Sequence, residues 1–398
     1  MIVRTGGSRR PGYPAAAAVF AIGMTGTTLP TPLYGLYQEE LGFSELTVTL
    51  VFAVYAIGVI AVLLLAGNYS DEAGRRPVLL IALGFSAASA LCFLFEGGLP
   101  LLFTGRLLSG FAAGLFSGTA TATVLELAPP GREARAGLAA TAANMGGLGC
   151  GPLLSGLLAQ YAPWPLRLPF LVHLTLVGVA CVLTWLLPET VRHPKRWPRP
   201  RPQGLSVPPR VRGVFAPSAL AAFAGFALLG LFTAVAPSFL SRTLGIHDLA
   251  LSGAVVFSVF LASTAGQALL GRVGVRRALP GGCHILVIGL LLVGASLAVE
   301  SLPLLVAGAV CGGFGQGLAF RAGMAAVGGA APPEHRGGTI SAFFVVAYAG
   351  ISLPVVGVGA LTLWLGLRTA GLAFTACVMV LTAGVGLYLQ RRPPPAGP

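Results

Sequence analysis

Long apolar runs alternate with short polar segments along the whole chain. A helix needs about 20 consecutive apolar residues to cross the hydrocarbon core of a bilayer, and twelve runs approach that length. They cover residues 14–35, 47–67, 78–96, 99–122, 136–160, 167–187, 214–238, 249–271, 278–298, 302–327, 338–362 and 367–389. The pattern predicts an all-α integral membrane protein with twelve transmembrane helices.

The composition agrees with a lipid environment. Hydrophobic residues make up 55% of the chain and charged residues 9%, whereas soluble domains carry about 25% charged residues. The net charge of +13 could suggest nucleic acid, but the basic residues form short clusters between the apolar runs. Because cytoplasmic loops of membrane proteins have this pattern, we expect the lipid bilayer and no nucleic acid as a partner.

The basic residues also predict the orientation. If the N-terminus is cytoplasmic, only Arg167, Arg242 and Arg368 fall on the outer side, and Arg106 and Arg321 fall inside spans. All other basic residues then lie on the inner side, as the positive-inside rule requires. Both termini are therefore expected in the cytoplasm. The first apolar run has no convincing cleavage site, so we interpret it as a membrane helix and not as a signal peptide.

Residues 188–213 interrupt the apolar pattern because they are rich in proline and arginine. They predict an extended or disordered cytoplasmic linker between a six-helix half at 1–187 and another at 214–398. The halves are related, since Leu99–Pro130 aligns without a gap to Leu302–Pro333. Both copies run from outside to inside, so the repeat is parallel and the halves are pseudo-symmetric. Transporters built from such repeats bind substrate between the halves, near the midplane.

The loop after the second span carries the sequence GNYSDEAGRR at residues 67–76. Gly67 permits close helix approach, and Gly74 allows a turn. Asp71 can pair with arginine or accept from a helix N-terminus. The loop resembles the signature motif of the major facilitator superfamily, both in sequence and in its place between spans two and three.

This resemblance implies a conformational latch. In that family the Asp and Arg of the loop bind the N-terminus of span eleven and an acid at the inner end of span four, which matches Glu126 here. The latch would hold the outward-open state, and the alternative is that these are solvated loop charges. The latch candidates are Gly67, Asp71, Gly74, Arg75, Arg76 and Glu126. The corresponding loop at 271–277 has no Asp, which predicts a full latch in one half only.

Two further motifs resemble the same family. Arg106 lies inside span four in a sequence similar to the family's second motif, and an intramembrane arginine is a functional candidate by default. In related exporters this arginine assists proton coupling, and the alternative is an arginine satisfied by backbone carbonyls. Span five resembles the antiporter motif, whose small residues and proline allow close packing and bending. Its candidates are Gly147, Gly151, Pro152 and Gly156.

The polar residues inside the spans supply the remaining candidates. Every carboxylate lies near a span end, so we expect no proton carrier of this type at the midplane. His173 and His284 lie inside spans and join Arg106 as coupling candidates, because histidine titrates near neutral pH; simple packing is the alternative. The cavity candidates are Tyr34, Tyr55, Asn144, Gln316, Arg321 and Tyr348. Such an apolar cavity suits a neutral or lipophilic molecule, and an anionic substrate is an alternative because of Arg106.

The six cysteines lie in apolar runs without metal-ligand spacing, so we expect no disulfide, metal or cofactor. The spans hold no acid–base dyad, and we therefore expect no enzyme. The sequence predicts a monomeric, multi-pass secondary transporter of the bacterial cytoplasmic (inner) membrane. It would work by alternating access and export a small molecule in exchange for protons. Import or facilitated entry of a sugar or organic acid is the main alternative, followed by a non-transporting sensor.

Overall fold

The computed structural model describes residues 12–67, 69–95, 97–192, 194 and 204–393, and it is helical over most of these ranges. The first half holds α1 (Tyr13–Thr28), η1 (Thr31–Leu33), α2 (Tyr34–Leu41), α3 (Glu45–Ala66), α4 (Tyr69–Ala73), α5 (Arg75–Leu94), α6 (Leu99–Glu126), α7 (Glu133–Tyr161) and α8 (Leu168–Leu186). The second half holds η2 (Pro209–Val211), α9 (Arg212–Gly230), η3 (Leu231–Val235), α10 (Ala236–Arg242), α11 (Leu249–Val273), α12 (Val275–Val299), α13 (Leu302–Ala330) and α14 (Arg336–Arg391).

The twelve predicted spans correspond to these helices, with three local departures. The first span changes from α1 to the short turn η1, where Pro30 and Pro32 lack the N–H groups that a continuous helix needs. The seventh span contains the π-helical turn η3 just before Pro237. The 56 residues of α14 form two spans, because Gly366 has φ of 77° and breaks the helix.

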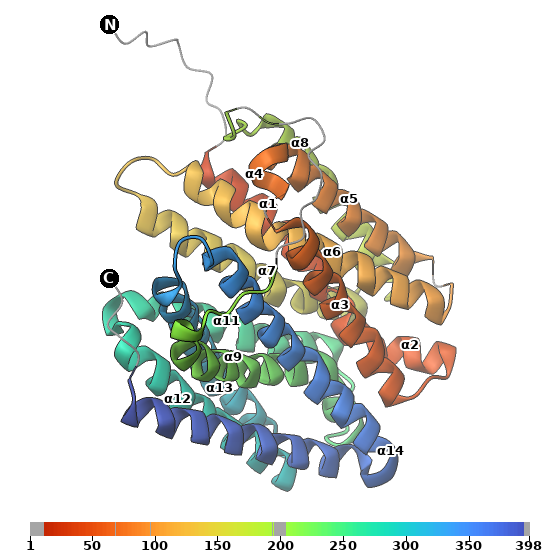
Figure 1. Cartoon of the computed structure of the whole chain (residues 1–398). Helices are drawn as coiled ribbons and strands as arrows, with labels where there is room; N and C mark the ends of the chain where they lie inside the picture. The colour runs from red at the N-terminus through yellow and green to blue at the C-terminus, as the bar shows by residue number, and fades with distance from the viewer. Residues whose placement is uncertain (1–11, 68, 96, 193, 195–203, 394–398) are drawn as a thin grey trace, which may run out of the picture.

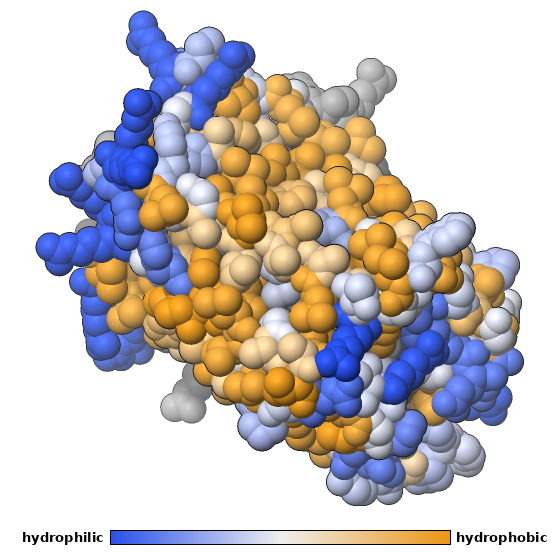
Figure 2. All heavy atoms as spheres, turned by 90° about the horizontal axis from the view of Figure 1, so that it is seen from below, coloured by the Kyte–Doolittle hydropathy of each residue, from blue (hydrophilic) through white to orange (hydrophobic). Residues whose placement is uncertain are grey.

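Nine helices among the described residues are long and apolar enough to cross a membrane. One of them is α14, whose length at 1.5 Å per residue far exceeds the roughly 30 Å core of a bilayer, so it counts twice. The other two spans are α1 with η1 and the Gly- and Ala-rich α7. Figure 2 shows the corresponding surface, a broad apolar band with hydrophilic residues gathered at its two ends.

The two halves lie beside each other in Figure 1, with the red-to-yellow helices on one side and the green-to-blue helices on the other. They meet along two helix pairs, α3 with α14 and α7 with α11. The second pair depends on glycine. A Cβ on Gly156 would lie 2.3 Å from the Leu249 carbonyl oxygen, and one on Gly253 would lie 2.2 Å from that of Pro152. Side chains at these positions would therefore force the halves apart.

The predicted linker, residues 188–213, is anchored at both ends. Residues 193 and 195–203 lie outside the described part of the chain. Before them, Glu189 and Thr190 contact the first half. After them, the Ser206 carbonyl oxygen accepts a hydrogen bond of 2.8 Å from Thr339, near the start of α14. These contacts hold the described ends of the linker, which are non-helical at 188–192 and 204–208, against the two halves.

Candidate functional site

A cavity of about 540 Å³ lies between the two halves, walled by α1, α3, α6 and α7 on one side and by α9, α11, α13 and α14 on the other. Five of the candidate residues predicted from the sequence line this cavity, namely Tyr55, Arg106, Asn144, Arg321 and Tyr348. Their side chains come from five helices, α3, α6, α7, α13 and α14. The fold therefore assembles most of the predicted cavity candidates at one place.

The cavity reaches the protein surface at one end of the bundle. Along α6 its lining runs from Arg106 to Leu125 in the last turn, and along α7 it begins at Gly137 near the first turn. Both helix ends lie on the side that carries Arg75, Arg76, Arg132 and Arg135, which we call the arginine-rich end. Leu125 is 43% exposed there. The cavity is thus open toward the arginine-rich end.

Arg106 is held deep in the wall of this cavity, where 2% of its surface is exposed. Its Nη1 donates a 2.5 Å hydrogen bond to the Thr27 carbonyl oxygen. Its guanidinium carbon lies 4.8 Å from the ring centroid of Tyr55 and 5.4 Å from that of Phe52. A backbone carbonyl and two aromatic faces therefore stabilise the cation, while its position still borders the substrate space.

Arg321 lies nearer the arginine-rich end and links the two halves. Its Nη1, on α13, donates a 2.6 Å hydrogen bond to Thr141 Oγ1 on α7. Asn144 lies one turn further along α7, and its Oδ1 is buried without a hydrogen-bond partner among the described residues. Thr141, Asn144 and Arg321 thus contribute polar groups to the lining of the cavity.

Two cavity candidates lie elsewhere. Tyr34 lines a separate cavity of about 310 Å³ at the opposite end of the bundle. Gln316 is packed between helices, where its Oε1 accepts a 2.7 Å hydrogen bond from Ser263. A Cβ on Gly225 would lie 2.7 Å from Gln316 Cγ. The prediction that both line the central space was wrong, because sequence depth alone does not give the direction in which a helix face points.

The two histidine candidates do not border the cavity either. His173 is fully buried in the first half, with Nε2 3.0 Å from Ser86 Oγ and its ring packed on Gly26. His284 lines a pocket at the arginine-rich end, and its Nδ1 lies 2.6 Å from the Pro280 carbonyl oxygen. Both environments match the packing alternative. Their predicted part in coupling would require action at a distance from the substrate.

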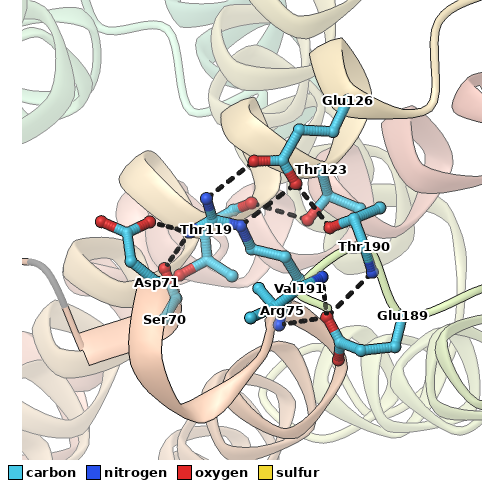
Figure 3. A network of polar contacts seen from close by, with 9 residues as sticks. All are labelled: Ser70, Asp71, Arg75, Thr119, Thr123, Glu126, Glu189, Thr190 and Val191. Atoms are coloured by element: carbon cyan, nitrogen blue, oxygen red, sulfur yellow. Dashed lines mark hydrogen bonds and ion pairs between the residues drawn. The ribbon is translucent and has the colours of Figure 1, made fainter. Parts of the chain in front are cut away.

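The latch candidates form a connected network at the arginine-rich end (Figure 3). Arg75 Nη1 lies 2.5 Å from Asp71 Oδ1, and Arg75 Nη2 lies 2.7 Å from Glu126 Oε1. Ser70 accepts a further bond of 2.6 Å from Nη1. Each described partner of this cluster belongs to the first half or to the segment directly after it. In this state the cluster therefore joins α4, α5 and α6 and does not bridge the halves.

Glu189 completes this network, and sequence reasoning missed its role. Its two carboxylate oxygens accept hydrogen bonds from the backbone N–H groups of Arg75 at 2.9 Å and Arg76 at 3.0 Å. A carboxylate at this position satisfies and stabilises the N-terminus of α5. Next to it, Thr190 Oγ1 donates a 2.5 Å hydrogen bond to Glu126. The available signal was an acid in the Pro-Glu-Thr sequence at 188–190, directly after the sixth span.

The other residues of the loop divide into two groups. Gly74 has φ of 98°, and a Cβ there would lie 2.8 Å from Glu189 Oε2, so its glycine is required. Arg76 donates a 2.5 Å hydrogen bond to the Trp185 carbonyl oxygen at the end of α8. Gly67 is exposed just after α3. Its expected part in close helix approach is therefore not realised here.

The glycines of α7 mediate close helix contacts. A Cβ on Gly147 would lie 2.5 Å from the Ala21 carbonyl oxygen, and one on Gly151 would lie 2.4 Å from that of Thr25. Both contacts are with α1, whereas Gly156 faces α11 in the other half. Pro152 lies inside the continuous helix. Glycines on two faces of α7 thus allow close packing, one face against α1 of its own half and the other against α11 of the partner half.

The opposite end of the cavity is closed by charged residues from both halves. Arg242 Nη1, at the end of α10, lies 2.9 Å from Glu45 Oε1, at the start of α3. Ser238 donates a 3.1 Å hydrogen bond to Glu45, and Arg242 donates one of 3.3 Å to Gln38. Close by, Gln160 Oε1 accepts a 2.9 Å bond from the backbone N–H of Leu249. The sequence placed Glu45 and Arg242 at this end but did not pair them.

The sequence of residues 16–283 matches the family described as the Major Facilitator Superfamily. Multidrug resistance protein 1 of Bacillus subtilis is 29% identical over 177 residues, which is 44% of each chain. Multidrug resistance protein MdtL of Salmonella schwarzengrund is 35% identical over 103 residues, or 26% of this chain and 23% of that one. The matches therefore span less than half the length of these relatives.

The fold is similar to that of a solved transporter of the same kind. A bacterial homologue of the human lysosomal transporter Spinster, in an inward-facing and unoccupied conformation, superimposes with a TM-score of 0.68. The match covers 98% of this chain and 100% of that one at 17% sequence identity. The sequence match over residues 16–283 shows that the chain belongs to the major facilitator superfamily, and its fold, with the helices of a multi-pass membrane protein, agrees with this.

Proposed function

We propose that this protein is a secondary active exporter that works by alternating access in the bacterial cytoplasmic membrane. Its substrate is a small lipophilic molecule, and protons move in exchange. The observation that best supports this proposal is the cavity between the halves. It is open at the arginine-rich end and closed at the other end by Glu45 and Arg242. A site accessible from one side at a time is what alternating access requires.

The orientation follows from the charges. With the arginine-rich end in the cytoplasm, the loops obey the positive-inside rule, and both termini are cytoplasmic. The structure is then an inward-open state that accepts substrate from the cytoplasm. The halves at 1–187 and 214–398 rock about the α3–α14 and α7–α11 contacts, while residues 188–213 connect them. The names of the two multidrug resistance relatives support export as the direction of transport.

The latch would act in the opposite state. Asp71, Arg75 and Glu126 are already assembled within the first half, so closing the arginine-rich end requires only that the start of α14 approach a preformed cluster. A preorganised cluster lowers the cost of forming that contact. Loss of the Asp71 charge should therefore impair the return to the outward-open state.

The test is growth of an efflux-deficient bacterium that expresses this protein, across a panel of toxic lipophilic compounds. We expect resistance to some compounds, lost in Asp71→Asn at equal membrane abundance. Glu40→Gln is the matched control, because Glu40 is an exposed acid on α2, at the end of the bundle opposite the latch cluster. Resistance in neither the wild type nor the control, with good expression, would contradict export and favour uptake of a sugar or organic acid.

A further inference from the structure

The charges inside the central cavity are all of one sign. Among the described residues that line it, the ionised side chains are Arg106 and Arg321, and the lining includes no aspartate or glutamate. The two arginines come from α6 in the first half and α13 in the second. A cavity with this lining attracts anions and repels cations, and its low-dielectric walls strengthen both effects.

Neither arginine is neutralised by a described protein carboxylate. The hydrogen bond of Arg106 goes to a neutral carbonyl oxygen, and its Nε is buried without a partner. Arg321 donates to the neutral hydroxyl of Thr141. A cation inside the membrane is costly unless it is paired. An anion that enters the cavity would supply the missing counter-charge.

The rest of the cavity is suited to an apolar body. Tyr348 packs against three other aromatic rings, with centroids 5.7 Å from Phe226, 6.3 Å from Tyr55 and 6.4 Å from Phe344. All four rings line the cavity. An aromatic or aliphatic body can bury its surface against this cluster.

We propose that the transported molecule is an amphipathic anion, with its sulfonate, carboxylate or phosphate group held by the cavity arginines and its apolar body held by the aromatic cluster. This inference rests on the proposed function and specifies the substrate class. Arg321 is the main selector, because it lies toward the open end and its bond to Thr141 already crosses between the halves. An anion bound there contacts both halves and can influence their relative motion.

The test uses three probes that share one naphthalene ring and differ in charge. They are 2-naphthalenesulfonate, 2-naphthalenesulfonamide and (2-naphthyl)trimethylammonium. Binding to the full-length protein in lipid nanodiscs is measured by isothermal titration. We expect the Kd of the sulfonate to be at least about tenfold lower than that of the sulfonamide. The trimethylammonium compound should bind more weakly than both.

The variant Arg321→Gln should remove most of the preference for the sulfonate, because it should weaken sulfonate binding far more than sulfonamide binding. Arg106→Gln provides a second test of the same prediction. Arg276→Gln is the control, because this exposed arginine lies outside the cavity at the same end. Equal binding of all three probes, preference for the cation, no binding of any probe, or an unchanged preference in both cavity variants would overturn the proposal.

The two proposals can fail separately. If the growth assay shows resistance that Asp71→Asn abolishes, but the sulfonate is not preferred, the exporter stands and the substrate class is wrong. If the sulfonate is preferred and Arg321→Gln removes that preference, but no compound is exported, the anion site stands and the direction of transport is wrong.

Discussion

Glu45 and Arg242 form an ion pair of 2.9 Å that joins the start of α3 in the first half to the end of α10 in the second. The Glu45 side chain is 7% exposed and that of Arg242 is 54% exposed. Ser238 also donates to the carboxylate. The pair therefore holds the two halves in contact at the end of the bundle that is opposite the cavity opening.

Neutralising Glu45 should loosen this end. Glu45→Gln removes the charge attraction, and because Arg242 is half in solvent we expect a modest cost of about 1.4 kcal/mol, or roughly tenfold in the population of the closed end. The measurement is the rate at which a membrane-impermeant maleimide labels Ser252→Cys. Ser252 lines the separate cavity of about 310 Å³ at this end. Labelling should be roughly tenfold faster in Glu45→Gln.

A second ion pair provides the control for this variant. Arg368 Nη1 lies 3.0 Å from Glu300 Oε1, also at a loop end, but both residues belong to the second half. Glu300→Gln should therefore leave the labelling rate of Ser252→Cys unchanged. Equal acceleration by both variants would mean that the effect does not arise from joining the halves.

The contact between α7 and α11 should be sensitive to a single methyl group. Gly156→Ala would place Cβ 2.3 Å from a backbone oxygen of α11, and overpacking of this kind costs about 1–3 kcal/mol. We expect α7 and α11 to separate there. The yield of a short cross-link between cysteines at Tyr161 and His247 should fall severalfold. Gly146→Ala, on the same helix but with open space around it, should leave the yield unchanged.

The carboxylate of Glu189 should contribute to stability through α5. Glu189→Gln replaces one acceptor oxygen with an NH₂ group, which cannot accept from the N–H of Arg75 or Arg76. We expect a loss of about 1–2 kcal/mol, seen as a lower midpoint of thermal unfolding. A midpoint that falls equally in Glu334→Gln would argue that any lost acid at this end has the same effect.

The sequence predicted the helices well because membrane spans are long and their apolar runs are continuous. The resemblance to the major facilitator superfamily also placed Glu126 with Asp71 and Arg75 of the loop motif. The sequence did not separate Gln316, which packs between helices, from Asn144, which lines the cavity. Both lie at central depth, and only the rotation of each helix decides which side faces the substrate.

Contacts between segments distant in the chain were also not predicted from the sequence. Glu45 and Arg242 belong to different halves and carry no local motif, so nothing in their neighbourhoods predicts the pair. Glu189 caps a helix that begins more than a hundred residues earlier in the chain. Such contacts depend on how the two halves and their connection pack, which the apolar pattern leaves undetermined.

The two ends of the bundle should open and close in opposition, which distances between spin labels can measure. With the six native cysteines replaced, one label pair at Tyr161 and His247 reports the Glu45 end. Another pair at Arg135 and Arg272, on the first turn of α7 and the last turn of α11, reports the arginine-rich end. Pulsed electron paramagnetic resonance then measures both pairs in the wild type and in Glu45→Gln. We expect Glu45→Gln to lengthen the first distance and to shorten the second. A first distance that lengthens while the second stays fixed or also lengthens would contradict alternating access by this protein.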